Sequence, residues 1–129
     1  MLQLQSTTLR AYNTFGIDVH ASRLAEIATS EDILEALEIR QKENRELLIL
    51  GGGSNLLFTR DVEDLLLLNR LKGINHSYLS EDEVLVEAAA GENWHTFVQF
   101  CIENNWGGIE NLSLIPGNVG ASPMQNIGA

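Results

Sequence analysis

The sequence is poor in cysteine, proline and basic residues, and each shortage excludes a class of protein. The 129 residues include one cysteine, Cys101, and two prolines. A disulfide or a cysteine-based zinc site within one chain is therefore excluded. Only 8 lysines and arginines stand against 18 acidic residues, giving a net charge of −10. Without any run of Lys or Arg, the chain is not expected to bind nucleic acid or an anionic membrane.

Long hydrophobic runs are also missing. The longest apolar run is much shorter than a membrane span, and the N-terminus lacks the basic-then-apolar layout of a signal peptide. We therefore expect a cytoplasmic protein with no membrane partner. A length of 129 residues with 44% hydrophobic residues suits one domain with a core. We find no internal repeat and no domain boundary.

The first half of the chain has the pattern of a β-α-β unit. The first ten residues fit an arm or a short edge strand, and residues 13–16 fit a capped turn anchored by Phe15. Strands are predicted over 23–28 and 47–50. The helix between them is expected to be capped by Ser30, to end near Asn44, and to bury a stripe of Ile33, Leu34 and Leu37.

The second half adds a small sheet and a helix, which makes the predicted fold class α+β. A third strand is expected over 65–68, then a turn at 70–73 and a hairpin of 74–79 and 84–89 with an acidic tip. A helix running from 91 to about 105 follows. Its expected core-facing residues are Trp94, Phe97, Val98 and Cys101, so that Cys101 is a buried, unreactive thiol.

A glycine-rich loop at 51–55 is the segment around which the chain is organised. The loop, Gly51-Gly52-Gly53-Ser54-Asn55, separates two apolar runs. Consecutive glycines cost backbone entropy there, and such loops let backbone N–H groups approach a phosphate. A P-loop needs a lysine that is missing, and a Rossmann fingerprint needs a third glycine where Leu56 stands. An anion nest formed by the N–H groups of residues 52–55 and a purely structural glycine turn remain.

The last 21 residues have a different character. Both prolines and many Gly, Ser and Asn residues occur here beside Ile, Leu and Met, without a clean period. Because a flexible linker would lack these apolar anchors, we expect an ordered binding loop.

Four motifs together resemble one family of enzymes. They are Asn13-Thr14-Phe15-Gly16, the loop 51–57, Ala90-Gly91-Glu92-Asn93-Trp94-His95 and the tail 115–129. In this order and spacing they resemble the UDP-N-acetylenolpyruvoylglucosamine reductases, also called UDP-N-acetylmuramate dehydrogenases. These are NADPH-dependent flavoenzymes of peptidoglycan precursor synthesis. Their substrate is UDP-N-acetylglucosamine enolpyruvate.

The resemblance implies non-covalent FAD in a domain of the vanillyl-alcohol-oxidase-like (PCMH) type. It implies that 51–55 cradle the FAD pyrophosphate, that 115–117 and 120–122 form an opposite wall, and that 125–129 approach the flavin. The expected cofactor-binding residues are Gly51, Gly52, Gly53, Ser54, Asn55, Ile115, Pro116, Gly117, Gly120, Ala121, Ser122, Gln125, Asn126, Ile127, Gly128 and Ala129. No metal is expected.

Two details qualify this resemblance. Some relatives with covalent flavin attach it to a histidine beside the glycine loop, but His20, His76 and His95 lie outside that loop. Each is therefore expected to be an ordinary surface or core histidine. Ala121 stands where the family commonly has serine, so one polar contact to the cofactor is in doubt.

The chain is much shorter than members of this family. We expect residues 1–129 to be the incomplete N-terminal portion of the FAD domain, because the family's tail motif continues with Tyr-Gly. No part of this sequence matches the family's substrate domain or its catalytic serine, glutamate and arginine. The chain alone is then expected to retain FAD weakly or not at all and to be inactive. The alternatives are a non-enzymatic FAD- or nucleotide-binding module, or another flavin oxidoreductase of the same fold.

Overall fold

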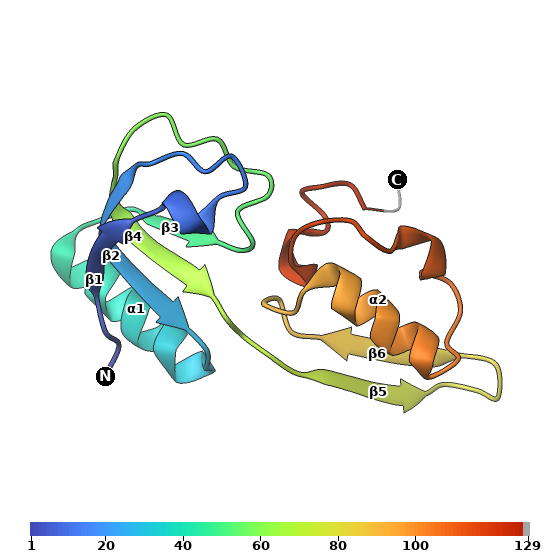
Figure 1. Cartoon of the computed structure of the whole chain (residues 1–129). Helices are drawn as coiled ribbons and strands as arrows, with labels where there is room; N and C mark the ends of the chain where they lie inside the picture. Colours follow the sequence, from blue (N-terminus) through green and yellow to red (C-terminus); the bar gives the residue numbers. More distant parts are fainter. Residues whose placement is uncertain (128–129) are drawn as a thin grey trace. The chain divides into compact units, whose positions relative to one another are not determined.

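The computed structural model describes residues 1–127, and it divides into two compact units, Met1–Arg70 and Leu71–Ala129. The first unit combines a four-stranded sheet with one long helix, and the second combines a two-stranded sheet with another helix (Figure 1). The α+β fold class is therefore confirmed. Sequence patterns gave no sign of the division after Arg70.

The sheet of the first unit has the strand order β1-β2-β4-β3. Strands β2 (His20–Ile27), β4 (Val62–Asn69) and β3 (Leu47–Leu50) are parallel, and the edge strand β1 (Gln5–Thr8) is antiparallel to β2. The predicted β-α-β unit is present, but β4 lies between its two strands. Because β2, β4 and β3 are parallel, their carboxyl ends share one edge of the sheet.

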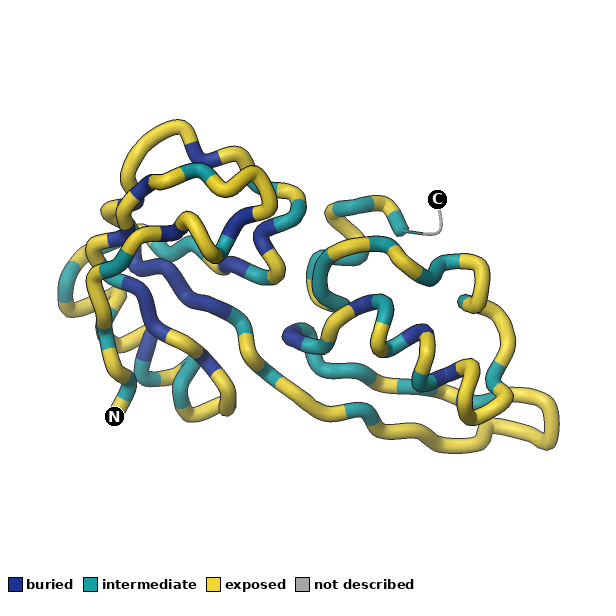
Figure 2. The backbone as a smooth tube through the Cα atoms, viewed as in Figure 1, coloured by how far each residue is buried: buried dark blue, intermediate teal, exposed yellow. Residues whose placement is uncertain are grey.

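Strand β4 is buried on both faces of the sheet, and its four leucines divide between two cores. Leu66 and Leu68 belong to the core that contains Leu50 and Phe58. Leu65 and Leu67 belong to the core that contains Ala36 of the helix. Figure 2 shows the burial concentrated in these central strands. Successive side chains of a strand alternate between faces, so an unbroken leucine run fits a strand covered on both sides.

Helix α1 (Ser30–Glu43) differs from its prediction in two details. Its N-cap is Thr29, not Ser30, and the Asp32 carboxylate completes a capping box with the Thr29 backbone N–H. Its buried residue is Ala36, whereas Leu34 and Leu37 are exposed. The predicted stripe is confirmed for Ile33, which is partly buried against the core that contains Ala36, and was wrong for Leu34 and Leu37. The predicted end is confirmed, since Asn44 caps the helix in the left-handed conformation.

In the second unit, helix α2 (Trp94–Glu103) covers one face of the hairpin formed by β5 (Ile74–Tyr78) and β6 (Val84–Ala88). Trp94, Val98 and Cys101 are buried and Phe97 is half-buried, which confirms the predicted stripe and the buried thiol. Residues 70–73 form no turn, so that prediction was wrong. They lead directly from β4 into β5.

Three short 3₁₀ helices complete the described chain: η1 (Arg10–Tyr12), η2 (Glu110–Leu112) and η3 (Val119–Ala121). The tail from residue 109 is thus ordered by two of them. Among the described residues, no helix has the length and apolar character needed to cross a membrane.

Candidate functional site

The glycine loop 51–55 follows β3 directly, at the edge where the parallel strands end. Ligands of open parallel sheets bind outside the carboxyl ends of the strands. Gly52 and Asn55 are exposed, while Gly53 is buried and has a φ of 68°. The loop therefore presents some of its backbone to solvent at the expected place for a ligand.

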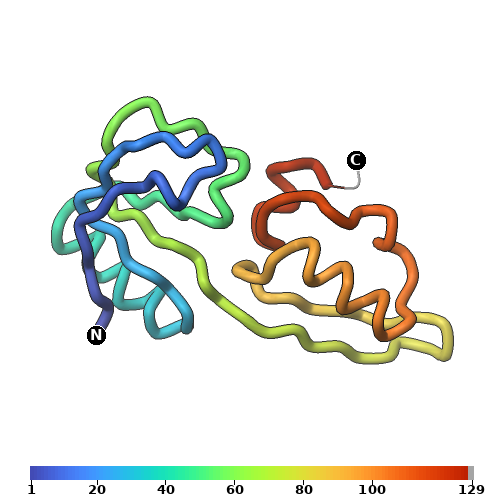
Figure 3. The backbone as a smooth tube through the Cα atoms, in the orientation of Figure 1, coloured from blue at the N-terminus to red at the C-terminus, as the bar shows by residue number. Residues whose placement is uncertain are grey.

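Part of this loop is fixed from within the first unit by the turn at 13–16. The Gly53 carbonyl accepts hydrogen bonds from the N–H and the hydroxyl of Thr14, both at 3.0 Å. A Cβ on Gly53 would lie 1.9 Å from the Tyr12 carbonyl oxygen. One of the three glycines is therefore required by packing and by its backbone conformation. Figure 3 shows this turn in blue beside the loop.

The turn itself is anchored by Asn13, not by Phe15. Phe15 is 69% exposed, whereas Asn13 is 7% exposed. The Asn13 amide donates to the carbonyls of Leu9 and Ile17, and its oxygen accepts from the Ile17 N–H. Asparagine side chains commonly organise turns in this way, so the sequence did carry the signal for this residue.

The outer backbone groups of the loop remain available for an anion. Within the described part of the chain, the N–H groups of the exposed residues Gly52 and Asn55 donate to no other residue. A diphosphate accepts hydrogen bonds from such groups without requiring a lysine. The residues present fit the pyrophosphate of FAD, with Gly53 serving packing as well.

The tail residues of the second unit are held against residues 90–94. The N–H of Trp94 donates to the Gly117 carbonyl, and the N–H of Val119 donates to the Glu92 carbonyl, at 3.0 and 2.8 Å. The Gly120 N–H donates to the Ala90 carbonyl at 3.0 Å. A Cβ on Gly120 would lie 2.7 Å from the Ala90 Cβ, so this glycine permits a close approach of two backbones.

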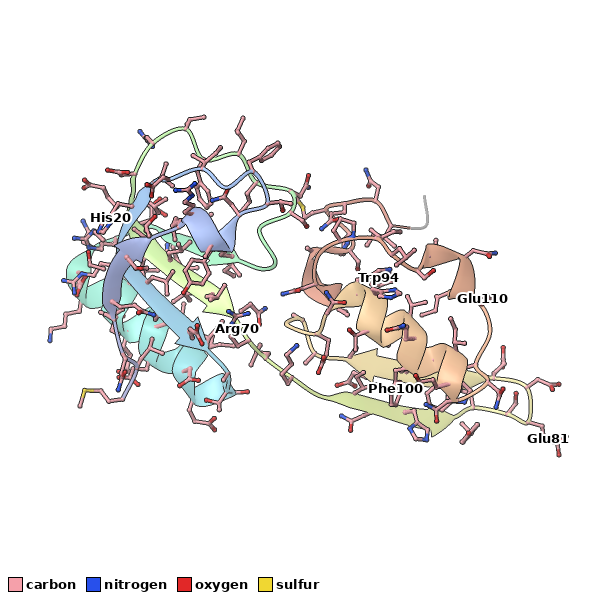
Figure 4. All side chains as sticks on the ribbon, in the orientation of Figure 1. His20, Arg70, Glu81, Trp94, Phe100 and Glu110 are labelled. Carbon is pink, nitrogen blue, oxygen red and sulfur yellow. The ribbon has the colours of Figure 1, made fainter. Side chains whose placement is uncertain are left out.

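The segment ahead of this contact is fixed by the first turn of α2. The indole Nε1 of Trp94 donates to the Leu112 carbonyl at 2.8 Å, and Nδ1 of His95 accepts from the Leu114 N–H at 3.0 Å. Leu114 has a φ of 63° and is 79% exposed. Figure 4 shows Trp94 on the side of α2 that faces the tail.

The loop before α2 has its own support in a lysine–glutamate pair. Lys72 Nζ donates to the Gly91 carbonyl and lies 3.3 Å from a Glu92 carboxylate oxygen. The other carboxylate oxygen of Glu92 accepts from the Gly73 N–H at 2.8 Å. These contacts, and that of His95 with Leu114, were not predicted. They join residues about 20 positions apart, for which the sequence gives no periodic signal.

The other predicted site residues lie as follows. Ser122 and Ala121 are half-buried, and they accept backbone hydrogen bonds from Ile127 and Gln125. Asn126 is exposed with a φ of 52°. Gly128 and Ala129 lie outside the described residues. The loop at 51–55 and the tail belong to different units, so the predicted opposite wall stays a prediction.

The second unit offers almost no positive charge to an anionic ligand. Its one basic residue, Lys72, is paired as described. Its acidic residues are Glu81, Asp82, Glu83, Glu87, Glu92, Glu103 and Glu110. A hollow of about 650 Å³ at the hairpin tip is lined by part of this acidic set and by Trp106, and includes none of the predicted cofactor residues. A phosphate bound by this unit would depend on backbone N–H groups rather than on cations.

Two perturbed ionisable groups in this unit lie outside the predicted site. Burial raises the pKa of the Cys101 thiol, which makes this cysteine a poor nucleophile. Hydrogen bonds from backbone N–H groups, first its own and then that of Gly108, lower the pKa of Glu110. No group of His, Cys, Asp and Glu residues suited to a metal occurs among the described residues.

The chain falls in a class of FAD-binding proteins. The sequence model of a family described as "FAD binding domain" matches residues 21–129, and the chain belongs to this family. Among the relatives it resembles, the UDP-N-acetylenolpyruvoylglucosamine reductase of Pseudomonas aeruginosa is 54% identical over 129 residues, with 99% of this chain and 38% of the relative covered. The reductase of the same name from Flavobacterium johnsoniae is 46% identical over 129 residues, with the same coverage.

A solved structure supports the fold. The crystal structure of UDP-N-acetylenolpyruvylglucosamine reductase from Thermus caldophilus matches with a TM-score of 0.69 and 24% identity, covering 95% of this chain and 41% of that one. The resemblance inferred from the four motifs is confirmed. The chain spans 38% of the length of the curated relatives named above.

Proposed function

We propose that this chain is the FAD-binding part of an NADPH-dependent reductase. The proposed overall reaction reduces UDP-N-acetylglucosamine enolpyruvate to UDP-N-acetylmuramate in peptidoglycan synthesis. The observation that carries the proposal is the 54% identity to a reductase of that name across 99% of this chain. The enolpyruvylglucosamine substrate is inferred from the name of that relative. NADPH is the expected hydride donor.

The proposed role of the chain's own residues is to bind and orient FAD. The exposed N–H groups of the glycine loop would hold the pyrophosphate, and the tail would supply further backbone contacts. Proposed contacts are Gly51, Gly52, Gly53, Ser54, Asn55, Ile115, Pro116, Gly117, Gly120, Ala121, Ser122, Gln125, Asn126, Ile127, Gly128 and Ala129. FAD, when bound, supplies hydride transfer between NADPH and the enolpyruvyl double bond. No residue of this chain is proposed to be catalytic.

Titration with FAD tests the binding step, with quenching of flavin fluorescence as the readout, in a chimera in which this chain replaces the matching residues of the Pseudomonas aeruginosa relative. In this proposal the diphosphate is bound by backbone N–H groups without a neighbouring cation. A carboxylate introduced into the loop should therefore repel the diphosphate. We expect Asn55→Asp to weaken FAD roughly tenfold. Asn75→Asp, which places the same charge on the exposed β5 strand, should have no effect. Equal affinities of the two variants would contradict a pyrophosphate site at the loop.

A chimera tests the reductase assignment. This chain replaces the matching 129 residues of the Pseudomonas aeruginosa relative, and FAD content and substrate-dependent NADPH oxidation are measured. FAD binding with turnover supports the proposal. A folded, FAD-loaded but inactive chimera would favour a non-enzymatic module. Turnover of a different substrate would favour another flavin oxidoreductase.

A further inference from the structure

The first turn of α2 holds the tail at several backbone positions, and His95 makes one of these contacts. Its Nδ1 accepts a hydrogen bond of 3.0 Å from the Leu114 N–H. Because a backbone N–H can only donate, this nitrogen must carry no proton, and the proton of the neutral ring is on Nε2. His95 therefore acts toward the tail as a hydrogen-bond acceptor.

Leu114 needs such a contact more than its neighbours do. It adopts the left-handed conformation, with a φ of 63°, and its side chain is 79% exposed. Left-handed backbone is unfavourable for a leucine and persists only where the surroundings fix it. Within the described part of the chain, the bond to His95 is the one hydrogen bond that its N–H donates. The exposed side chain supplies little packing to compensate.

The residues on either side show what this conformation serves. Trp94 holds the Leu112 carbonyl through its indole and the Gly117 carbonyl through its backbone N–H. Between these two fixed points lie residues 113–116, and Leu114 changes the direction of the chain there through its left-handed backbone. Gly117 has a φ of 111°. Residues 115–117 are therefore presented in a conformation that depends on Leu114.

We propose that His95 is a positioning residue for the FAD site. By accepting the Leu114 N–H, it fixes the backbone that presents Ile115, Pro116 and Gly117 to the cofactor. This inference rests on the proposed function for its cofactor, and on the geometry of the second unit for its mechanism. His95 itself does not contact the reacting atoms.

Three substitutions of His95 distinguish the effect of the hydrogen-bond acceptor from the effect of the size of the ring. His95→Asn places an amide oxygen near the position of Nδ1, His95→Gln carries its oxygen farther out, and His95→Leu removes the acceptor. The first readout is hydrogen exchange of the Leu114 amide by NMR without cofactor. The second is FAD affinity by flavin fluorescence, measured with each variant placed in the chimera described above. His20→Leu and His20→Asn, in the first unit, are matched controls, since the His20 ring is bonded to Ser6.

We expect His95→Leu and His95→Gln to speed exchange at Leu114 at least about fivefold and to weaken FAD by a similar factor. His95→Asn should restore both values, and the His20 variants should change neither. The inference is overturned if His95→Leu behaves as the wild type in both readouts, or if His95→Asn is as impaired as His95→Leu. Failure of the chimera that carries the unmodified chain to bind FAD would overturn the proposed function and the cofactor part of this inference. The exchange pattern would still decide whether His95 holds Leu114.

Discussion

The carbonyl of Gly53 accepts two hydrogen bonds from Thr14, one from its backbone N–H and one from its hydroxyl. This relationship joins the turn after η1 to the loop after β3, across about 40 residues of sequence. It gives the glycine loop a rigid inner side, while the N–H groups of Gly52 and Asn55 remain available on the outer side. A loop that is fixed on one side is preorganised for a ligand on the other.

The first prediction concerns Gly53→Ala. The new Cβ would lie 1.9 Å from the Tyr12 carbonyl oxygen and 2.9 Å from the Asn13 Cα. Both are backbone atoms that cannot move aside cheaply. We expect a loss of about 3 kcal/mol or more in the free energy of unfolding, measured by urea denaturation.

Gly16→Ala provides a matched control. Gly16 has a φ of 64°, close to the 68° of Gly53, but a Cβ added there would meet no atom within 4 Å beyond its own chain neighbours. It therefore reports the backbone strain alone, for which we expect roughly 1 kcal/mol. Similar losses in the two variants would show that the close packing of Gly53 on Tyr12 has no energetic weight.

The second prediction concerns the anchor of the turn. Asn13→Ala removes two donors and one acceptor from a buried position and leaves the Ile17 N–H and carbonyl without these partners. We expect a loss of about 2–4 kcal/mol in urea unfolding. Thr14→Val, which removes one hydroxyl bond and keeps the size of the side chain, should cost about 1 kcal/mol. A smaller effect for Asn13→Ala than for Thr14→Val would contradict the anchoring role.

The elements of the fold followed from local pattern, because hydrophobic period and capping residues act within a few positions. The strand 47–50, the hairpin and helix α2 were predicted in this way. The position of β4 between β2 and β3 was not predicted, since the order of parallel strands depends on long-range packing. The exposure of Leu34 and Leu37 was missed for the same reason. Which face of a helix packs on the sheet depends on how closely the two approach.

The candidate site divides in a similar way. Its glycines and tail residues could be predicted from motifs, because glycine and proline indicate unusual backbone conformations by their residue type alone. Asn13 bonds to backbone groups four residues away, within the reach of a turn signal in the sequence, whereas Glu92 and His95 act through hydrogen bonds to backbone groups 19 residues away. Such bonds leave no period in the sequence. The sequence does not reveal such a role for a histidine, because the role depends on which backbone N–H group lies beside its ring nitrogen.

The third prediction is a pH dependence of the first unit. The Asp32 carboxylate accepts from the N–H groups of Ala28 and Thr29, and these two bonds, Ala28 first, lower its pKa. A carboxyl group whose pKa is lower in the folded than in the unfolded protein stabilises the fold at pH values above its ordinary pKa. This contribution is lost as the pH falls through the pKa of the folded protein. Urea unfolding between neutral and acidic pH should show Asp32→Asn less stable than the wild type at neutral pH, with the difference vanishing in acid.

Glu31→Gln is the control for this capping effect. Glu31 lies in the same first turn of α1, but among the described residues its side chain makes no bond to the cap. Its substitution should leave the pH profile close to that of the wild type. A profile of Asp32→Asn that runs parallel to the wild type at all pH values would show that the capping box does not couple protonation to folding.

The fourth prediction concerns the pair that supports the loop before α2. Glu92 accepts from the Gly73 N–H and pairs with Lys72, while Lys72 is more exposed and also bonds the Gly91 carbonyl. Glu92→Ala should therefore destabilise the second unit by about 1–2 kcal/mol, and Lys72→Met by less than about 1 kcal/mol. Glu92→Gln should fall between them, because it keeps an acceptor for Gly73. Both tryptophans of the chain, Trp94 and Trp106, lie in this unit, so tryptophan fluorescence during urea unfolding reports its stability. If Lys72→Met were the more damaging change, the lysine and not the glutamate would be the main support of residues 90–92, and through them of the tail.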